Sequence, residues 1–473
     1  DDFNSIRKPM DENLIDSGKL VTLSQHDAEY AIYSFQEILR IPTVSITSPD
    51  SGEYIKCSEY LLKELLSISV LQGVHILPES PLNSPVIVAH WRGTQPDLPV
   101  ILLNSHYDVV PADRDDWTVP PFDGIRKDGV IYGRGAQDMK CVCIQYIEAI
   151  RFLMKHNFTP TRSIYLTFVP DEEVSGSGMA ALLNSNLYKN ELPGIALALD
   201  EGLASTDDTF SLFYGERLGW WVDVTAQGNT GHGSRFIENT AVEQLLLLAN
   251  KALTFREEQR KLLFSNPSHE NCAHAVAAAA AKKRTIGDVT SLNITTLQAG
   301  VQIGNSFAYN CVPPVAKCSF DIRISPHTPP SEIASMLDLW CQECKSGGPE
   351  ASTEVSWKFV YGLDGDSESM EDNFRHAMTS TDKQVNPWFD VLLNSFQKRG
   401  LQITPQVFPA ATDSRFLRLL GIRAFGFSPM RNTEILLHEN DESLSESTFL
   451  EGISVYIALI FDLASHCFPE SMV

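Results

Sequence analysis

Apolar residues in the first part of the chain form two kinds of pattern. Short unbroken apolar runs at residues 99–103, 163–169 and 195–199 are typical of strands buried on both faces of a parallel sheet. Around them, apolar residues recur every three or four positions, which predicts helices. These helical patterns cover residues 28–40, 54–66 and 139–154. Strands alternating with helices predict an α/β fold with a central, mostly parallel sheet and flanking helices.

After residue 217 the pattern changes to alternation of apolar and polar residues. Alternation at 220–226, 289–297 and 316–324 predicts antiparallel strands with one face in water, accompanied by helical patterns at 240–253 and 331–344. We therefore expect a small α+β unit inserted into a larger domain, which resumes with a strand at 422–427 and a helix at 446–466. The predicted segments are an N-terminal arm at 1–27, the first part of the larger domain at 28–216, the insert at 217–360 and the second part at 361–473. An alanine run at 277–281 within the insert is interpreted as a solvated extension.

Composition and charge exclude several classes of protein. The chain has 473 residues with 37 basic and 60 acidic side chains, which gives a formal charge of −23. This charge argues against a nucleic-acid partner, and a hydrophobic content of 43% argues against a disordered acidic chain. The apolar run at 455–461 is too short to span a bilayer, so we expect no membrane segment. Nine scattered cysteines favour free thiols in a reducing, cytoplasmic compartment.

Acidic and imidazole side chains gather where the predicted strands end. Open α/β sheets bind ligands beyond the carboxyl ends of their strands. In this chain those positions, together with the start of one helix and a short apolar run at 436–438, carry His106, Asp108, Asp138, Glu172, Glu173, Asp200, Glu201 and His438. Buried carboxylates repel one another, and a divalent cation removes that repulsion. Imidazole with carboxylate suits zinc or, less selectively, other first-row divalent ions, so the pattern predicts a metal site.

The pattern also predicts a division of roles among the carboxylates. One carboxylate can bridge two metal ions, and another can stay free as a general base. Glu172 and Glu173 are neighbours, so on an extended backbone their side chains diverge, one toward the metal and one toward the attacking water. Spacing does not decide between Asp200 and Glu201 as the ligand after the third strand.

Several longer segments around these residues are individually specific. They are LLNSHYDVVP (102–111), RGAQDMK (134–140), VPDEEV (169–174), LDEG (199–202), GHGSRF (231–236), ATDSR (411–415), GFSPM (426–430) and LLH (436–438). In this order they resemble the zinc-dependent aminoacylase/carboxypeptidase family of metallohydrolases from about residue 28 to the C-terminus. The resemblance implies that the larger domain is catalytic and binds zinc, and that the insert is a lid and dimerisation domain.

The resemblance further implies a role for each residue of the cluster. The implied ligands of two zinc ions per subunit are His106, Asp138, Glu173, Glu201 and His438, with Asp138 bridging both ions. Glu172 is implied as the general base that activates the metal-bound water, and Asp108 as the group that orients His106. For the ligand after the third strand, the resemblance favours Glu201 over Asp200.

Residues outside the cluster are assigned by the same resemblance. His232 is expected to reach the active site of the partner subunit of a homodimer and to stabilise the developing oxyanion. Asn310, Arg323 and Arg415 stand at positions similar to those that hold the substrate carboxylate, a task that suits the forked guanidinium of arginine.

The implied activity is that of a metal-dependent amidohydrolase. Its reaction is hydrolysis of a small N-acyl-L-amino acid to a carboxylate and a free L-amino acid. A dipeptidase or carboxypeptidase of the same family is the alternative, differing in substrate and not in metal chemistry. A non-catalytic binding protein on this fold would be expected to lack a ligand or the base, and all are present. A serine hydrolase is disfavoured because no G-x-S-x-G elbow follows a strand.

Overall fold

The computed structural model describes residues 15, 18–264, 284–345, 353–360 and 374–468. They fold as two compact units. Unit 1 comprises residues 1–214, 379–406 and 412–473, and unit 2 comprises residues 215–378 and 407–411. The alanine run at 277–281 lies outside the described residues.

Unit 1 is built on an eight-stranded mixed sheet, of which only the last residues of β8 and β17 belong to unit 2. In spatial order the strands are β1 (Gln72–Ile76), β2 (Ile87–Trp91), β6 (Ile164–Val169), β3 (Val100–His106), β7 (Ile195–Asp200), β18 (Ala424–Gly426), β8 (Thr209–Glu216) and β17 (Gln402–Phe408). The central strands β6, β3, β7 and β18 are parallel, whereas β1, β2 and β8 pair antiparallel with their neighbours. The predicted α/β class with a parallel centre is confirmed.

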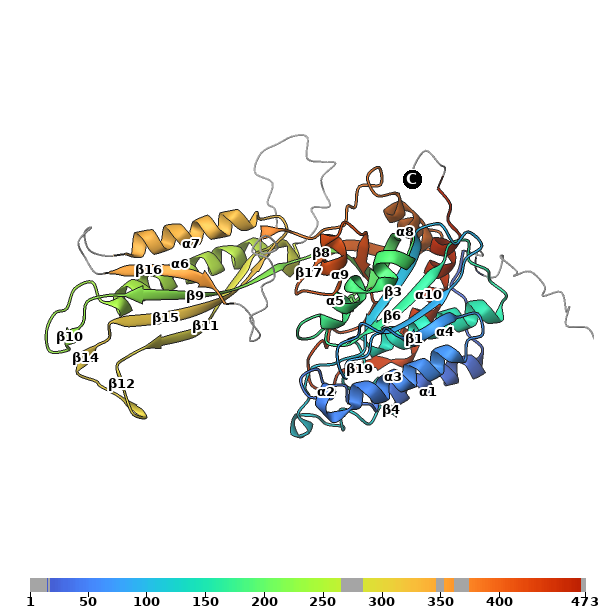
Figure 1. Ribbon diagram of the computed structural model, residues 1–473, viewed down its shortest axis with the longest axis horizontal. Helices are drawn as coiled ribbons and strands as arrows, with labels where there is room; N and C mark the ends of the chain where they lie inside the picture. The colour runs from blue at the N-terminus through green and yellow to red at the C-terminus, as the bar shows by residue number, and fades with distance from the viewer. Residues whose placement is uncertain (1–14, 16–17, 265–283, 346–352, 361–373, 469–473) are drawn as a thin grey trace, which may run out of the picture. The chain divides into compact units, whose positions relative to one another are not determined.

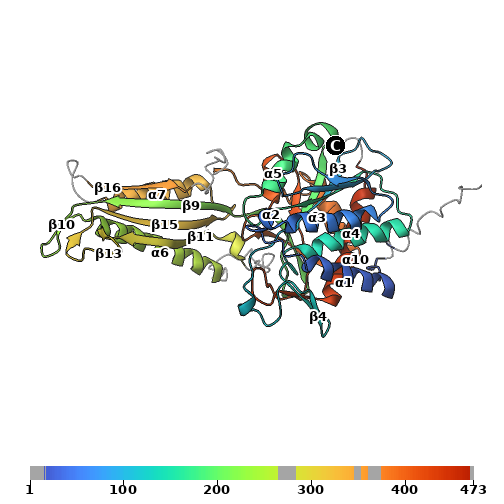
Figure 2. The same cartoon turned by 60° about the horizontal axis from the view of Figure 1, so that its bottom comes forward.

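Helices cover both faces of this sheet. Successive side chains along a strand point to opposite faces, so each central strand buries residues under both layers of helices. Leu103 of β3 belongs to the core under α1, α3, α4, α8 and α10, whereas its neighbour Leu102 belongs to the core under α5 and α9. Figure 2 shows α5 above the sheet and α1, α4 and α10 below it. The helices are α1 (Gln25–Leu39), α2 (Ser48–Ser51), α3 (Glu53–Leu66), α4 (Lys140–Lys155), α5 (Ser177–Asn184), α8 (Pro387–Gln397), α9 (Ser414–Leu419) and α10 (Glu446–Ser465). A small sheet of β4 (Ile125–Lys127), β5 (Val130–Tyr132) and β19 (Ser443–Ser445) completes the unit.

Helix α10 is apolar along most of its length. By length and composition alone it could cross a membrane, in contrast to the sequence-based expectation of no such segment. It packs on α4 and α8, and residues from Ile453 to Ile460 are buried continuously. Burial in the core of unit 1 therefore accounts for its composition.

Unit 2 is a two-layer α+β unit. Its antiparallel sheet has the order β11 (Ser291–Ala299), β15 (Val315–Ile324), β9 (Leu218–Gln227), β16 (Glu354–Phe359). The alternation predicted for β9 is confirmed, since Trp220, Val222 and Val224 pack in a core with α6 (Ala241–Phe264) and α7 (Pro330–Cys344), whereas Trp221 is exposed. Helix α6 is longer than the predicted 240–253. Figure 1 shows α6 and α7 over one face of this sheet, with the short ladder of β10 (Gly231–His232) and β14 (Cys311–Val312) at one end. A short hairpin comprises β12 (Gln302–Ile303) and β13 (Ser306–Phe307).

Candidate metal centre

Three parallel neighbouring strands of unit 1 deliver their following residues to one edge of the sheet. Strand β3 ends at His106, β7 ends at Asp200, and β6 ends three residues before Glu172. Because β6 and β7 flank β3 in parallel, their carboxyl ends meet. The pairing of the central strands thus brings together the part of the predicted cluster that follows these strands.

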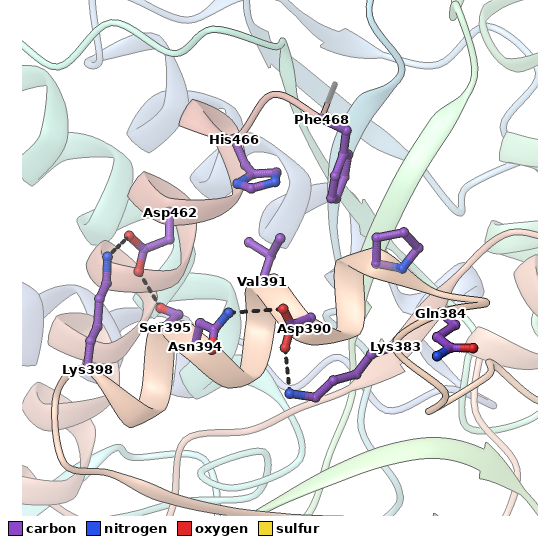
Figure 3. Close-up of a pocket in the computed structure, with 11 residues that line it drawn as sticks. Lys383, Gln384, Asp390, Val391, Asn394, Ser395, Lys398, Asp462, His466 and Phe468 are labelled. Carbon is purple, nitrogen blue, oxygen red and sulfur yellow. Dashed lines mark hydrogen bonds and ion pairs between the residues drawn. The ribbon is translucent and has the colours of Figure 1, made fainter. Parts of the chain in front are cut away.

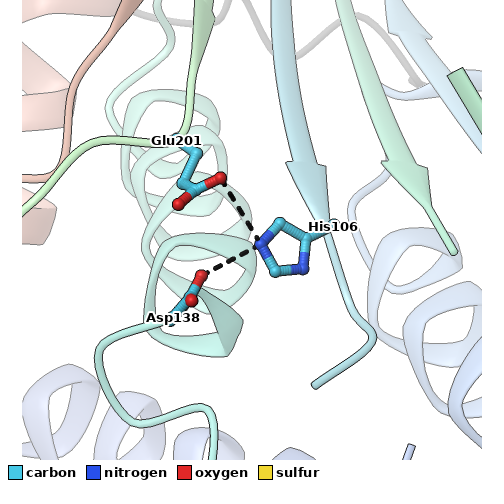
Figure 4. Close-up of side chains that lie close together, drawn as sticks. All are labelled: His106, Asp138 and Glu201. Atoms are coloured by element: carbon cyan, nitrogen blue, oxygen red, sulfur yellow. Dashed lines mark hydrogen bonds and ion pairs between the residues drawn. The ribbon is translucent and has the colours of Figure 1, made fainter. Parts of the chain in front are cut away.

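The first group of possible metal ligands is His106, Asp138 and Glu201. The Nε2 atom of His106 lies 3.0 Å from Oδ1 of Asp138 and 3.8 Å from Oε2 of Glu201. Figure 4 shows both carboxylates directed at this nitrogen from different segments. All three side chains are buried.

A second group, Asp138, Glu173 and His438, shares one residue with the first. The Nε2 atom of His438 lies 3.2 Å from Oδ2 of Asp138 and 3.1 Å from Oε2 of Glu173. Each oxygen of Asp138 therefore faces a different histidine, which is the arrangement expected of a bridging carboxylate. In each group the ligand atoms lie within 4.8 Å of one another, close enough to surround one cation.

Charge repulsion within the cluster supports a cation site. Burial raises the pKa of Glu201 well above its ordinary value, and repulsion from Asp138 adds to the rise. Burial and repulsion from Asp138 also raise the pKa of Glu173 to about 7, and its Oε1 atom is buried without a hydrogen bond. Hydrogen bonds to Asp138 and Glu173 raise the pKa of His438 to about 10. Burial alone would raise the pKa of Asp138, but hydrogen bonds with the two imidazoles hold it below its ordinary range. A pair of divalent cations fits this donor set, since it would compensate the crowded negative charge.

Glu172 lies beside the first group without belonging to it. Its Oε2 atom is 3.9 Å from Nε2 of His106, and burial raises its pKa well above the ordinary value. The side chains of Glu172 and Glu173 diverge, as expected, and lie near different histidines, but the expected reason for the divergence was wrong. Their backbone is a turn, preceded by Asp171 with a φ of 65°, and is not extended. The reversal of the chain at this turn, and not strand alternation, separates the two side chains.

Asp108 anchors this turn as well as contacting His106. Its carboxylate accepts hydrogen bonds from the backbone N–H groups of Glu172 (3.1 Å) and Glu173 (3.2 Å). Nδ1 of His106 lies 3.5 Å from the same carboxylate and 3.1 Å from the backbone oxygen of Asp108. The hydroxyl of buried Ser45 donates to Asp108 over 2.8 Å. Sequence reasoning missed Ser45, because it lies in a loop 63 residues earlier and carries no motif.

The structure brings Glu201, and not Asp200, to the cluster. The carboxylate of Asp200 accepts from Nδ2 of Asn104 (2.9 Å) and from the hydroxyl of Ser414 (2.7 Å). Asn104 in turn accepts from the hydroxyl of Thr167 over 2.6 Å. This buried chain of hydrogen bonds crosses β6, β3 and β7 to α9, so both carboxylate oxygens of Asp200 already have donors.

His438 does not end a strand. The apolar run at 436–438 leads into a turn, and His438 has a φ of 62°. The N–H of Leu436 donates to Oε1 of Gln137 over 3.1 Å, so the segment is held by side chains rather than by a neighbouring strand. The interpretation of this run as part of the sheet edge was therefore wrong, although His438 does reach the cluster.

The predicted residues of unit 2 occupy opposite ends of its sheet. His232 pairs with Cys311 in the β10–β14 ladder, and the N–H of Gly233 donates to the oxygen of Asn310 over 2.7 Å. His232 and Asn310 are both exposed. Arg323 lies at the far end of the ten-residue strand β15, which spans roughly 33 Å at 3.3 Å per residue. One chain therefore cannot bring Asn310 and Arg323 to the same small carboxylate.

Arg415 and its neighbour Asp413 stand at the start of α9 in unit 1. Nε of Arg415 is buried without a hydrogen bond, and its guanidinium carbon lies 4.6 Å from the ring centre of Phe416. Both carboxylate oxygens of Asp413 are likewise buried and unpartnered. Sequence reasoning missed Asp413, although it lies within the ATDSR segment.

A cavity of about 680 Å³ lies elsewhere in unit 1 and contains none of the predicted site residues. Figure 3 shows Val391 of α8 between two ion pairs, with His466 and Phe468 on the opposite wall. Lys383 pairs with Asp390 and Lys398 with Asp462, each over 2.5 Å. Because the charged side chains that line this cavity already pair with one another, the cavity offers no chemistry comparable to that of the metal cluster.

A largely buried cluster of two imidazoles and three carboxylates at the edge of a parallel sheet, with a free carboxylate beside it, defines a metal-dependent hydrolase. A model of Peptidase family M20/M25/M40 matches residues 102–462, and the chain belongs to this family.

Relatives from this family align over most of the chain. Aminoacylase-1 of Dictyostelium discoideum is 40% identical over 91% of this chain and 97% of its own length. Aminoacylase-1 of Homo sapiens is 39% identical over 91% of this chain and 94% of its own length. The predicted resemblance is thus confirmed.

Solved structures share the fold at low identity. Human carnosine dipeptidase 1 has a TM-score of 0.64 at 15% identity and covers 96% of this chain and 98% of its own. A dinuclear metal binding peptidase of the M20 family from Bacillus subtilis has a TM-score of 0.62 at 11% identity and covers 93% of this chain and 99% of its own.

Proposed function

We propose that this chain hydrolyses N-acyl-L-amino acids to a carboxylate and a free L-amino acid, with two zinc ions bound by His106, Asp138, Glu173, Glu201 and His438. The similarity to aminoacylase-1 over nearly the full length supports the substrate class. The observation that carries the metal chemistry is Asp138, whose two oxygens face His106 and His438 at 3.0 and 3.2 Å.

The residues around the cations divide the reaction between them. Bound zinc would supply a Lewis acid and a water of lowered pKa. Glu172, largely buried and 3.9 Å from His106, takes the proton of the attacking water and returns it to the leaving amine. Asp108 holds this base in place through the backbone N–H groups of Glu172 and Glu173.

The substrate carboxylate needs a local cation, because the chain as a whole carries a formal charge of −23. Arg415 is the best placed residue of unit 1, since its Nε has no hydrogen bond. Arg323 is less available, because Asp321 binds its guanidinium at 2.7 and 3.1 Å. Asn310 can meet the same substrate as Arg323 only if the two residues come from different copies of the chain.

We assign His232 to the active site of the partner subunit, where it donates to the developing oxyanion. The surface that fits a second copy is the exposed edge of unit 2. Strand β11 lies at the edge of the four-stranded sheet in the described part of the chain, and its Leu297 is exposed. Leu246 and Leu253 of the neighbouring helix α6 are exposed as well. An open edge strand beside an apolar helical face is suited to isologous pairing in a homodimer.

A cytoplasmic location is consistent with the thiols. The eight cysteines among the described residues are all free, and six are buried. Free thiols persist in a reducing compartment, so fractionation of the source cells should recover the activity in the cytosol.

A substrate panel tests the proposed function. The zinc-loaded protein is assayed on N-acetyl-L-amino acids and on dipeptides, before and after chelation. Hydrolysis of the N-acetyl compounds, lost on chelation and restored by zinc, is the expected result. Cleavage of dipeptides alone would favour the dipeptidase alternative, which the fold shared with carnosine dipeptidase 1 keeps open. Sedimentation of Leu297→Asp beside wild type tests the dimer, since a monomeric wild type would contradict it.

A further inference from the structure

A buried glutamate outside the ligand groups holds the loop that carries Asp138. Glu442 is completely buried and precedes β19. Its Oε1 accepts from the backbone N–H groups of Gln137 (2.6 Å) and Asp138 (3.1 Å). Its Oε2 accepts from the N–H of Gly135 and from Nη1 of Arg134, both over 2.9 Å. Four donors from the single loop at residues 134–138 thus converge on one carboxylate.

The same loop is tied back to the segment that carries His438. Oε1 of Gln137 accepts from the N–H of Leu436, and its Nε2 donates to the backbone oxygens of Glu434 (3.0 Å) and Ser443 (2.9 Å). Arg134 donates to the backbone oxygen of Glu439 over 3.1 Å. Glu442 lies at the centre of these contacts between segments about 300 residues apart in the chain.

We propose that Glu442 is a positioning residue that sets the two oxygens of Asp138 for both metal sites, without binding metal itself. The inference rests on the proposed role of Asp138 as the shared ligand. A carboxylate is required because it only accepts hydrogen bonds. An amide in its place would turn its NH₂ group toward two of the four donors, whichever way it were oriented. The loop would then shift, and Asp138 belongs to both ligand groups.

Metal binding by Glu442→Gln tests this role directly. Zinc affinity of the metal-free protein is measured by competition with a chromogenic chelator, so that catalysis does not enter. Outer partners of metal ligands typically contribute 10–100-fold to affinity, and we expect a loss of about that size at both sites. His438→Ala, in contrast, should weaken one site, because His438 belongs to one group. Visible spectra of the Co²⁺-loaded protein should change in Glu442→Gln if the ligand geometry shifts.

The matched control is Glu64→Gln. Glu64 of α3 is also buried and accepts from the hydroxyl of Tyr30 (2.8 Å) and from Nη2 of Arg151 (3.0 Å), within the helical layer. This variant should lower the melting temperature and leave zinc affinity and the Co²⁺ spectrum unchanged. If it lost as much zinc affinity as Glu442→Gln, general destabilisation would explain both, and the positioning role would be wrong.

The remaining outcomes separate this inference from the proposed function. Wild-type affinity in Glu442→Gln would overturn the inference alone. A wild type that binds no zinc would overturn the proposed function, and the inference with it. If Glu442→Gln does not fold, Glu442→Asp replaces it in the test. Aspartate keeps the two acceptor oxygens, but its shorter side chain does not bring them as close to the four donors. It should bind zinc more weakly than wild type, and equal binding would contradict the role.

Discussion

The metal cluster of unit 1 and the His232 end of unit 2 are built in opposite ways. In the cluster, His106, Asp138 and Glu201 are buried, whereas His438 is exposed and contacts both Asp138 and Glu173. His232 is exposed and held by a ladder of two residue pairs and by a 2.8 Å contact between its Nδ1 and the hydroxyl of Ser234. Buried groups with several partners are preorganised, whereas an exposed side chain with one local partner must gain its final environment from another surface.

Because of this difference, we expect metal binding to depend on unit 1 and completion of the active site to depend on the His232 end of unit 2. The cluster has its candidate ligands within one unit of a single chain, so metal content should not depend on residues of unit 2. The end of unit 2 offers a hydrogen-bond donor but no acidic cluster of its own among the described residues. Substitutions of the candidate metal ligands should therefore lower zinc content, whereas substitutions at the His232 end should lower kcat without changing zinc content.

The largest effect is expected from Glu172→Gln. This change removes the proposed general base while keeping the shape of the side chain, so kcat should fall by roughly 10²–10⁴-fold. Zinc content, measured by elemental analysis, should stay at the wild-type value, because Glu172 belongs to neither ligand group. Glu439→Gln, an exposed glutamate near His438, serves as the control and should keep wild-type turnover. Retained turnover in Glu172→Gln would remove Glu172 from the mechanism.

A smaller effect is expected from His232→Asn. Loss of one donor to an oxyanion typically lowers kcat by roughly 10²–10³-fold. Zinc content should be unchanged, because His232 is not in either ligand group. A fall in zinc content together with kcat would contradict the separation of the two regions.

Mixing His232→Asn with Glu172→Gln extends this test to the subunits. If His232 acts in the partner's site, a mixed dimer has one intact site, and roughly a quarter of wild-type activity should return on random pairing in a two-fold dimer. Absence of any recovery after subunit exchange would show that His232 acts in its own chain.

The sequence predicted the cluster where apolar runs end, and failed where the backbone turns. Strands β3 and β7 are continuous apolar runs, so the positions of His106 and Glu201 at their ends follow from the pattern. The turn at Glu172 and the turn at His438 depend on Asp108 and Gln137, which are distant in the chain and carry no periodic signal. Side-chain hydrogen bonds of this kind cannot be read from hydrophobic spacing.

Strand register is a second feature of the structure that could not be predicted from the sequence. Motif similarity grouped Asn310, Arg323 and Arg415 as residues that hold the substrate carboxylate. The pairing of β15 with β9 and of β14 with β10 places Arg323 and Asn310 at opposite ends of unit 2, so these two residues can meet one carboxylate only if they come from two copies of the chain. Register arises from pairing between strands, so distances along the sheet were not available from motifs.

The arginines should differ in their effect on KM. Arg415→Lys should raise KM by roughly 10–100-fold, because loss of a charged hydrogen bond costs about 1.5–3 kcal/mol. Arg323→Lys should raise KM less, since Asp321 already occupies its guanidinium. Steady-state kinetics on one N-acetyl-L-amino acid measures both. A larger rise in KM for Arg323→Lys than for Arg415→Lys would assign binding of the substrate carboxylate to Arg323 of unit 2.

The smallest effect is expected from Ser45→Ala, which acts two contacts away from the chemistry. Its hydroxyl donates to Asp108 over 2.8 Å, and Asp108 in turn holds the backbone N–H groups of Glu172 and Glu173. Because Asp108 keeps these two donors, kcat should fall by less than about tenfold, below the 10–100-fold typical of groups bonded directly to a ligand. Ser58→Ala is the matched control, since its buried hydroxyl donates to the backbone oxygen of Ile55 over 2.7 Å. That control should lose similar stability in thermal unfolding and keep wild-type kcat. Equal kcat in Ser45→Ala and Ser58→Ala would mean that the turn at Glu172 keeps its position without the Ser45 hydroxyl. The hydrogen bonds that preorganise the cluster would then end at Asp108.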